Sequence, residues 1–390
     1  MTRARRRELV IILGALSAFG PLSMDMYLPG LPSLSRQLHA SASAGQLTLT
    51  GCMLGIALGQ LIAGPFSDSL GRRLPLLSGI AAYAIASAIC AVAPSILMLI
   101  VLRFIQGLAG GVGVVIARAI VRDLFAGVTA ARMFATLMIV TGVAPVFAPL
   151  IGGQVLEITS WRGIFGVLAA IGVPLWLITA RRLPETLAPG ARHGGGLRAT
   201  VRTFGQLMAD RRFAPHAISF SLSFGAMFAY IAGSSFVLEN VFGASPQAFS
   251  LVFAVNSVGL ITMSQVGSRL VSRRGAATLT RYGLCLVALA SLSTLLVTAT
   301  HGALAPLLVC LFALLCGNGL VLPNGVAAAM GDQTALGSAS ALLGLGQFGV
   351  GAAVAPLVGL AGSHDALPLG IVIGACGLSA LLVDLLFAPR

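Results

Sequence analysis

The stretch GPFSDSLGRR, residues 64–73, lies between two long apolar segments and carries the clearest signal of how the chain folds. Gly64 and Gly71 permit a tight turn between two helices, because glycine tolerates backbone conformations that other residues avoid. Asp68 can hold an arginine or the positive N-terminal end of a neighbouring helix. A turn that only anchors a chain on one side of a membrane would need the two arginines but not the aspartate and the glycines. The stretch therefore indicates a loop with a task beyond topology.

The segments on both sides of this loop are typical of the whole chain, which is strongly apolar. Of its 390 residues, 57% are hydrophobic and 9% are charged, whereas an ordinary soluble domain has about 25% charged residues. The mean hydropathy is +0.98. In a soluble protein, a formal net charge of +13 would suggest a nucleic-acid partner. Here the composition indicates a protein that lies in the lipid bilayer throughout, and no nucleic acid is expected as a partner.

The apolar residues form segments long enough to cross a membrane. A helix needs roughly 20 apolar residues to span about 30 Å of hydrocarbon, and the sequence holds twelve such segments, most of them joined by very short loops. They are residues 9–28, 45–66, 74–93, 95–117, 133–155, 164–180, 214–237, 247–268, 277–299, 305–327, 337–360 and 367–387. The predicted fold class is therefore an all-α integral membrane protein with 12 transmembrane helices.

All 24 basic residues are arginines, and their distribution predicts the orientation of the chain. If the N-terminus is inside, 21 arginines fall on the inner side, Arg36 and Arg162 fall in outer loops, and Arg103 lies within a span. Basic residues concentrate on the cytoplasmic side of membrane proteins. Both termini are therefore expected in the cytoplasm.

The longest loop divides the spans into two sets of six. The predicted organisation is a six-helix half over residues 1–180, a cytoplasmic Arg/Gly-rich linker over 181–213 and a second six-helix half over 214–390. The halves are pseudo-symmetric, because GSRLVSRRG follows the eighth span as GPFSDSLGRR follows the second. Two such halves with a binding site between them are typical of transporters. The number of spans alone leaves a receptor or a scaffold open.

A charged side chain within the bilayer is costly and points to function. Asp25 lies in SMDMYLPGLP, residues 23–32, and Pro21 and Pro29 weaken the helix on both sides of it. At 1.5 Å per residue, Asp25 lies roughly 24 Å from the inner end of its span and Arg103 roughly 12 Å from the outer end of its own. Both are thus expected in the outer half, where they can share one cavity. The alternative is a permanent ion pair that only joins two helices.

Other polar residues are candidates for the same cavity. Gln106, with Gly107 and Gly110, recurs on the face of the span that carries Arg103. In the second half the candidates are amides and an aromatic residue, namely Tyr230, Asn256, Asn324 and Gln347. Together with Phe and Met, such side chains suit a broad, adaptable pocket. The alternative is that the amides only make hydrogen bonds between helices.

No pattern of metal ligands or catalytic residues stands out. The six cysteines fall inside apolar stretches, and the five histidines fall in loops or near the ends of spans. A metal, a cofactor and an enzymatic activity are therefore not expected. A sensor is not expected either, since no soluble domain is attached to the spans.

The fifth span carries TGVAPVFAPLIGG, residues 141–153, which resembles the antiporter motif of drug exporters. That motif reads approximately G-x-x-x-G-P-x-x-G-G. The corresponding residues are Gly142, Pro145, Pro149, Gly152 and Gly153. The match is incomplete, because Ala144 precedes the first proline and the second proline adds a kink. Gly and Pro in membrane helices also serve close packing, so this motif favours export without deciding it.

The loop at residues 64–73 fits G-x-x-x-D-x-x-G-R-R/K, and here the chain resembles the major facilitator superfamily. Further stretches follow the order seen in its Bcr/CflA drug-efflux family, namely MDMYLPGLP, GQLIAGPFSDSLGRR, RFIQGLAGG, ARAIVRDLF, GVAPVFAPLIGG, SWRGIF, LPETL, LPNGVAAAM and GSASALLGLGQ. The resemblance implies the major facilitator fold, with this loop as a cytoplasmic gate that latches the two halves. The gate motif is Gly64, Asp68, Gly71, Arg72 and Arg73.

The resemblance further implies a proton-coupled multidrug efflux antiporter that works by alternating access in the inner membrane of a bacterium. Its substrates are expected to be small neutral or monocationic antibiotics of the bicyclomycin or chloramphenicol kind. Asp25 matches the family's embedded acidic residue and Arg103 its arginine in the fourth span, so both are assigned to proton coupling. The residues expected to bind substrate are Asp25, Tyr27, Arg103, Gln106, Tyr230, Asn256, Asn324 and Gln347.

The alternative function is export of a metabolite or an amino acid by the same fold. The residues barely separate the two kinds of cargo, although the motif in the fifth span favours a drug exporter. A monomer is expected in either case, because one chain carries both halves of the pathway.

Overall fold

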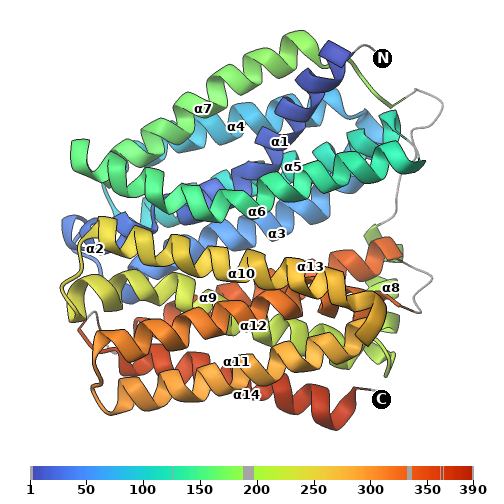
Figure 1. Ribbon diagram of the computed structural model, residues 1–390. Coiled ribbons are helices and arrows are strands. Elements are labelled where there is room, and N and C mark those ends of the chain that lie inside the picture. The colour runs from blue at the N-terminus through green and yellow to red at the C-terminus, as the bar shows by residue number, and fades with distance from the viewer. Residues whose placement is uncertain are drawn as a thin grey trace. The chain divides into compact units, whose positions relative to one another are not determined.

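The computed structural model describes residues 3–125, 127–187, 197–331, 336–360, 362 and 364–388, and all regular structure in them is helical (Figure 1). The long helices are α1 (Arg3–Asp25), α3 (Ala42–Leu70), α4 (Arg73–Ala91), α5 (Ile96–Leu124), α6 (Gly127–Ile158), α7 (Trp161–Arg182), α9 (Ala214–Phe236), α10 (Pro246–Arg274), α11 (Ala276–Ala299), α12 (Leu304–Met330), α13 (Leu336–Val358) and α14 (Leu367–Phe387). The shorter elements are η1 (Leu28–Gly30), α2 (Leu31–Gln37), α8 (Leu197–Ala209) and η3 (Val237–Val241). Among the described residues, 12 helical segments are long and apolar enough to cross a membrane, which confirms the predicted fold class.

The first span is built from three pieces instead of one helix. α1 ends at Asp25, the 3-10 turn η1 follows, and α2 extends the apolar segment to Gln37. Pro29 explains the break, because it has no N–H to donate to the carbonyl of Asp25. The predicted end of this span at residue 28 is therefore too early.

The chain divides into two compact units. The first comprises Met1–Leu34 and Gly51–Leu197, and the second comprises Ser35–Thr50 and Arg198–Arg390. The end of α2 and the beginning of α3 thus belong to the second unit, although they precede most of the first in sequence. The predicted division into two halves and a linker stays a prediction, and the middle of that linker, residues 188–196, lies outside the described residues.

In the first unit, α1 packs against α5, α6 and α7, and α4 packs against α5 and α7. Their apolar faces form a core in which the rings of Phe19 and Tyr83 stack with centroids 4.1 Å apart. α3 and α5 come into backbone contact, because a side chain at Gly107 would overlap the carbonyl of Cys52. This contact lies one turn from Arg103 and fixes the position of that part of α5.

In the second unit, α9 is enclosed by α12, α13 and α14, and α11 packs against α12 and α14. The segment Ser35–Thr50 adds hydrogen bonds to this unit. The side chain of Gln46 donates to the carbonyl of Ala232 at 3.2 Å, and that of Thr50 donates to the carbonyl of Ala352 at 2.9 Å. The segment is thereby attached to α9 and α13.

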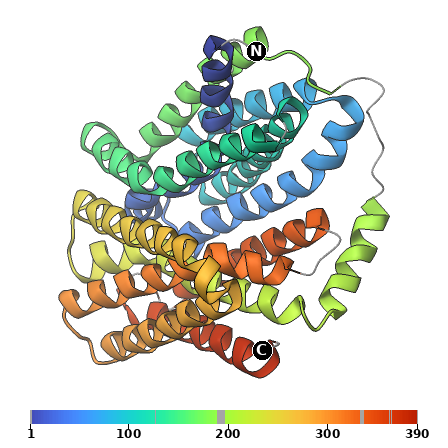
Figure 2. The same ribbon diagram turned by 45° about the vertical axis from the view of Figure 1, so that its right-hand side comes forward.

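A helix that the sequence did not predict lies in the expected linker. α8 ends at Ala209, and the chain changes direction before α9 begins at Ala214 (Figure 2). Asp210 forms this turn, because its carbonyl accepts from the N–H groups of Phe213 and Ala214 and its side chain accepts from the N–H of Arg212 at 2.9 Å. A side chain that caps the backbone in this way is typical of turns.

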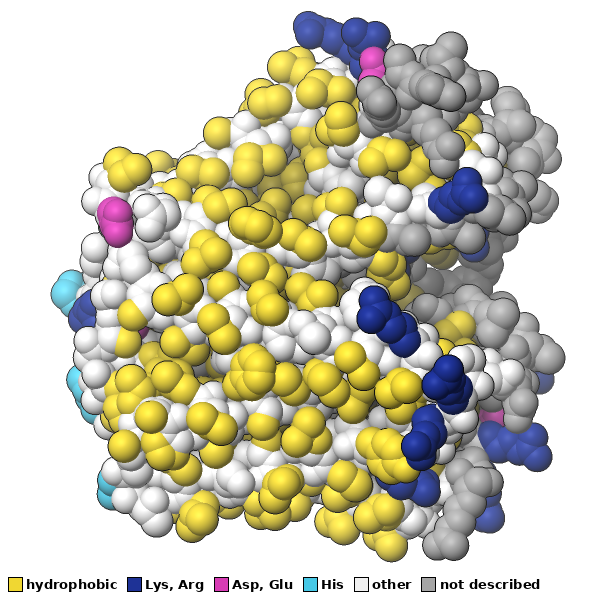
Figure 3. Space-filling view, viewed as in Figure 1, with side chains coloured by type: hydrophobic (Ala, Val, Ile, Leu, Met, Phe, Trp, Pro, Cys, Tyr) yellow, Lys and Arg dark blue, Asp and Glu magenta, His cyan; other side chains and the backbone are white. Residues whose placement is uncertain are grey.

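Hydrophobic side chains cover the flanks of helices in the second unit, and arginines gather at one end of them (Figure 3). α10 carries Arg273 and Arg274 in its last turn, and Arg281 lies near the start of α11. In the first unit, the last turn of α7 likewise carries Arg181 and Arg182. Apolar flanks with basic ends are typical of helices in a bilayer. The chain is a multi-pass membrane protein, while the cytoplasmic location of its arginine-rich ends stays a prediction.

Candidate functional site

The loop between α3 and α4 holds a buried arginine with two carboxylate partners. The guanidinium of Arg72 lies 2.5 Å from Oδ1 of Asp68 and 2.9 Å from Oδ2 of Asp123, and its side chain is 7% exposed. Burial tends to lower the pKa of Arg72, but the hydrogen bonds to Asp123 and Asp68 outweigh burial and raise the pKa above its ordinary value. Arg72 therefore stays charged and joins the end of α3 to α5.

The chain that follows α7 closes the start of α4. The carboxylate of Glu185 accepts hydrogen bonds from the backbone N–H of Arg72 at 2.8 Å and of Arg73 at 3.1 Å, where a helix leaves N–H groups unpaired. The guanidinium of Arg73 in turn donates to the carbonyls of Ala180 and Leu183. α4 and α7 are thus clamped together at their arginine-rich ends.

Neither Asp123 nor Glu185 was predicted to belong to this loop. Both are far from Arg72 in sequence, and only the packing of α4, α5 and α7 brings the three together. A signal was present, because each acid lies in a stretch that carries the family resemblance, ARAIVRDLF and LPETL.

We expect Glu185→Gln to weaken this clamp in a pH-dependent way. Burial raises the pKa of Glu185, but four backbone N–H groups outweigh burial and hold the pKa below its ordinary value of 4.5. Such a carboxylate contributes stability above the unfolded pKa, and this contribution is lost as the pH falls through the folded pKa. At neutral pH the variant should therefore melt at a lower temperature than the wild type in detergent, and the difference should vanish in acid.

The matched control for this experiment is Glu157→Gln. Glu157 is exposed on α6 and has no hydrogen-bond or ion-pair partner among the described residues, so its replacement should leave the melting temperature unchanged. A Glu185→Gln difference that stayed constant from neutral pH into acid would contradict the role of the ionised carboxylate.

Arg103 on α5 is completely buried and organises three helices. Its Nη1 lies 2.5 Å from Oε1 of Gln106, and its Nη2 donates to the carbonyl of Ser23 at 2.8 Å. Gln106 donates to the hydroxyl of Ser87 at 2.6 Å, and that hydroxyl donates to the carbonyl of Tyr83 at 2.7 Å. The network connects α1, α4 and α5.

Two aromatic rings cover the guanidinium of Arg103. Its Cζ lies 4.3 Å from the ring centroid of Tyr27 and 5.6 Å from that of Phe165. Attraction between a cation and a ring face offsets part of the cost of burying the charge. The predicted substrate contacts of Tyr27, Arg103 and Gln106 would require these helices to move, because all three side chains are fully buried.

Asp25 ends α1, two residues beyond the carbonyl that binds Arg103. Its side chain is 6% exposed, and no hydrogen bond or ion pair from the described residues reaches its carboxylate, Arg103 included. The permanent Asp25–Arg103 pair considered above is thus not formed in this structure. α6 contacts the adjacent backbone, because a side chain at Gly152 would overlap the carbonyl of Met26. Gly152 of the predicted antiporter motif therefore lies beside Asp25.

The other residues of that motif lie along the same helix. α6 continues through Pro145 and Pro149 without a break. A Cβ added at Gly142 would meet nothing within 4 Å, so packing in this structure does not require a glycine there. The contact that matters for the site is the one made by Gly152.

Of the four candidates in the second half, the structure brings two together. Asn256 on α10 donates to the hydroxyl of Tyr230 on α9 at 2.9 Å, and both are buried. Asn324 donates to the carbonyl of Leu320 in its own helix at 2.8 Å, and Gln347 on α13 is half-buried. Within the described part of the chain, no hydrogen bond links Asn324 or Gln347 to the Tyr230–Asn256 pair.

The sequence did not predict a buried ion cluster in the second unit. Asp384 of α14 is 1% exposed, accepts a hydrogen bond from Nε of Arg281 at 2.8 Å and lies 3.8 Å from Nδ1 of His216. These residues come from three helices that are distant in sequence, so only the fold brings them together. In the residues that the structure describes, no group of three or more His, Cys, Asp or Glu side chains could hold a metal ion.

Comparison with known proteins identifies the family. The sequence model described as the Major Facilitator Superfamily matches residues 13–356. The chain belongs to the major facilitator superfamily. Among similar solved structures, the nucleoside transporter NupG superposes with a TM-score of 0.78 over 97% of this chain and 99% of that one, at 14% identity. At that identity the likeness concerns the fold alone.

Two relatives are similar to this major facilitator over nearly its whole length. An uncharacterized MFS-type transporter of Bacillus subtilis, YdgK, is 40% identical over 379 residues, which are 95% of this chain and 93% of the relative. A bicyclomycin resistance protein homolog of Haemophilus influenzae is 30% identical over 382 residues, which are 98% of this chain and 96% of the relative. The resemblance to a drug-efflux family is thereby confirmed. Family and fold are those of membrane transporters and not of enzymes.

Proposed function

We propose that this major facilitator exports small neutral or monocationic antibiotics in exchange for protons, by alternating access. The observation that carries the proposal is Asp25, a residue that is 6% exposed in a membrane-spanning segment and whose carboxylate has no partner among the described residues. A charge in such a place is costly, and binding a proton removes the cost. The bicyclomycin resistance homolog supports an antibiotic as the cargo.

One protonatable carboxylate is energetically sufficient for this task. A proton that moves down a potential of about 150 mV yields roughly 3.5 kcal/mol. Since about 1.4 kcal/mol corresponds to a factor of ten, one proton per cycle supports a gradient of roughly a few hundredfold for a neutral drug. A concentration gradient of this size is sufficient for resistance to an antibiotic.

In the proposed cycle, Asp25 takes up a proton when the cavity is open to the outside and releases it to the cytoplasm as the drug binds. Arg103 acts as a positioning residue, which is supported by its bond to the carbonyl of Ser23 and its complete burial. The Arg72 cluster, with Asp68 and Asp123, serves as the latch of the cytoplasmic gate. Tyr230 and Asn256 contribute to the drug pocket from the second half.

The experiment that tests the function measures accumulation of chloramphenicol and bicyclomycin in an efflux-deficient bacterium, with and without the protein and an uncoupler. The protein should lower accumulation, and the uncoupler should abolish the effect. Export that persists in the uncoupler would contradict proton coupling. If neither antibiotic is moved, export of a metabolite or an amino acid takes the place of drug export. Equal export of a dicationic compound would contradict the proposed preference for neutral and monocationic drugs.

A further inference from the structure

The turn η3 at the end of α9 is a π-helix, and Glu239 lies in its middle. Turns of this kind are rare and often mark functional sites. The Oε1 atom of Glu239 is buried and has no hydrogen-bond partner among the described residues. A buried oxygen without a donor is unfavourable, so this carboxyl needs a proton or a ligand.

Two other elements of the second unit meet α9 at this turn. Nη1 of Arg36 on α2 donates to Oδ1 of Asn240, the residue that follows Glu239, at 3.2 Å. The side chain of Gln46 on α3 donates to the carbonyl of Ala232, two turns before Glu239. The end of α9 is thus covered by α2 and the beginning of α3.

These elements carry a cluster of unpaired oxygens. Nine buried side-chain nitrogen or oxygen atoms in the described residues lack a partner, and five of them belong to α2, α3, α9 and η3: Oγ of Ser35, Oε1 of Gln46, Oγ of Ser234, Oγ of Ser235 and Oε1 of Glu239. Residues three and four apart share a helix face, which places Ser235 and Phe236 on the face of Ala232, against α3. Ser35 lies against the same face, because a side chain at Gly45 would overlap its hydroxyl and come within 3.4 Å of the Phe236 ring.

We propose that Glu239 is a second proton-binding carboxyl of the transport cycle. An ionised carboxylate is an acceptor only, and protonation removes the negative charge that lacks a donor at Oε1 of Glu239. The step is a simple protonation, in which one O–H bond of a hydronium ion breaks, one O–H bond forms on Glu239 and a water molecule is left. The positive charge of Arg36 opposes any cation at this turn, the proton included. A proton needs only the carboxyl oxygen to which it bonds, whereas sodium needs several oxygen ligands, so the proton is the cation assigned to the site.

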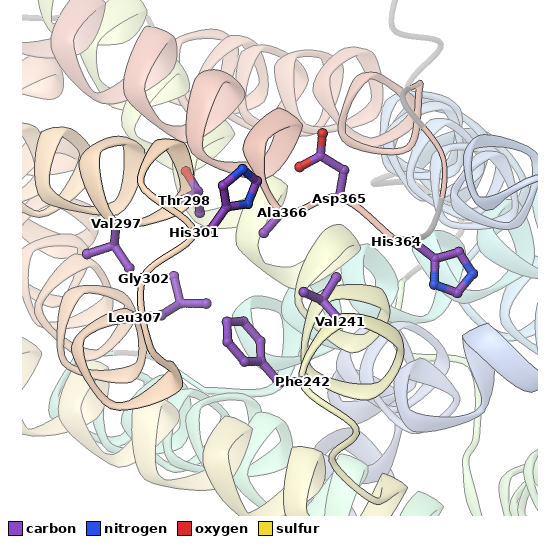
Figure 4. A pocket seen from close by; sticks show the side chains of 10 residues that line it. All are labelled: Val241, Phe242, Val297, Thr298, His301, Gly302, Leu307, His364, Asp365 and Ala366. Carbon is purple, nitrogen blue, oxygen red and sulfur yellow. The ribbon is translucent and has the colours of Figure 1, made fainter.

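Among the described residues, few charged or titratable groups lie near this carboxyl. Arg36 is the charged residue that acts on Glu239, and α10, which also packs against η3, has no titratable residue before Arg269. A cavity of about 150 Å³ opens beside the turn (Figure 4). Val241 and Phe242 line one side of it, and the titratable residues on its lining are His301, His364 and Asp365. The cavity is therefore lined by the last residue of the turn that carries Glu239.

The inference deepens the proposed function and rests on it in one respect. If Asp25 and Glu239 each bind a proton, one cycle carries two protons, and this number has meaning only if the protein exchanges protons for drug. Protonation of Glu239 itself does not depend on the identity of the cargo. It is therefore measured first and without a drug.

The experiment is infrared difference spectroscopy on the full chain in lipid, titrated with acid in the absence of drug. The wild type should show a protonated-carboxyl band that is lost in Glu239→Gln and kept in Asp25→Asn and in the control Glu157→Gln. Isotopic labelling of glutamate separates this band from that of Asp25, and its loss in Glu239→Gln separates it from the bands of Glu8, Glu157 and Glu185. The proposal is overturned if no label-sensitive band appears, if the band persists in Glu239→Gln, or if sodium shifts it at constant pH.

A second experiment measures the protons released when chloramphenicol binds, and it tests whether Glu239 takes part in the transport cycle. The number of protons released per drug molecule should fall by half in Glu239→Gln, and an unchanged number would overturn the assignment of Glu239 to the cycle. Absence of release from the wild type would instead count against drug and proton exchange, while the infrared band still decides whether Glu239 binds a proton.

Discussion

Asp25→Asn is expected to abolish export that depends on the proton gradient. Asparagine keeps the shape of the side chain but cannot take up and release a proton at neutral pH. In the proposed cycle the drug displaces the proton of Asp25, so exchange should stop even though Glu239 can still bind its proton. In the accumulation assay, cells with the variant should hold as much chloramphenicol as cells without the protein, and the uncoupler should make no further difference.

Two further variants make this result specific. Asp25→Glu keeps the carboxyl and should retain part of the export, which separates protonation from the exact position of the group. Glu157→Gln removes an exposed negative charge from α6 and should export as the wild type does. Uncoupler-sensitive export by Asp25→Asn would show that Asp25 is not required for exchange and that Glu239 sustains it alone.

Arg103→Lys is expected to lower both stability and export, although the positive charge is retained. A lysine ammonium lacks the planar fork with which arginine reaches several acceptors at once and lies over an aromatic ring. In the wild type one guanidinium donates hydrogen bonds both to Oε1 of Gln106 and to the carbonyl of Ser23. A lysine at this position would leave at least one of these acceptors without a donor. A buried polar group that loses its partner costs roughly 1–3 kcal/mol. The melting temperature in detergent should fall, and drug accumulation should rise toward that of cells without the protein.

The matched control is Arg162→Lys. Arg162 also lies over an aromatic ring, with its Cζ 4.3 Å from the centroid of Trp161, and it donates to the carbonyl of Ala93 at 3.0 Å. It is only half-buried, so its replacement should cost little. If Arg103→Lys kept the melting temperature of the wild type but lost chloramphenicol binding, Arg103 would contact the drug and would not merely position α1.

The spans could be predicted from sequence because the bilayer demands a helix of a certain length and polarity. Their ends depend on backbone hydrogen bonds that hydropathy does not record. The helix break after Asp25 was indicated by Pro29, whereas the π-helical turn around Glu239 has no such marker in the sequence. The attachment of Ser35–Thr50 to the second unit was also unpredictable, since it rests on bonds between residues far apart in sequence.

For the candidate site, the sequence indicated the depth of two residues but not their contacts. Residue counting along two helices gave Asp25 and Arg103 a similar depth, and Arg103 does bind the carbonyl of Ser23, two residues before Asp25. Counting cannot tell which way a side chain points, so it could not show that the guanidinium binds this backbone instead of the carboxylate. For the same reason the partners of Arg72 in α5 and after α7 emerged only from the fold.

The attachment of Ser35–Thr50 bears on how this chain could be divided into two genes. A cut within residues 188–196 would make a first fragment that carries Ser43, Gln46 and Thr50, whose hydrogen-bond acceptors are all on the second fragment. Neither fragment would then contain all the residues of its own compact unit. The second fragment would keep the carbonyl groups that bind Ser43, Gln46 and Thr50 of the first. Fragment complementation should therefore succeed with this cut and fail when the first fragment lacks residues 35–50.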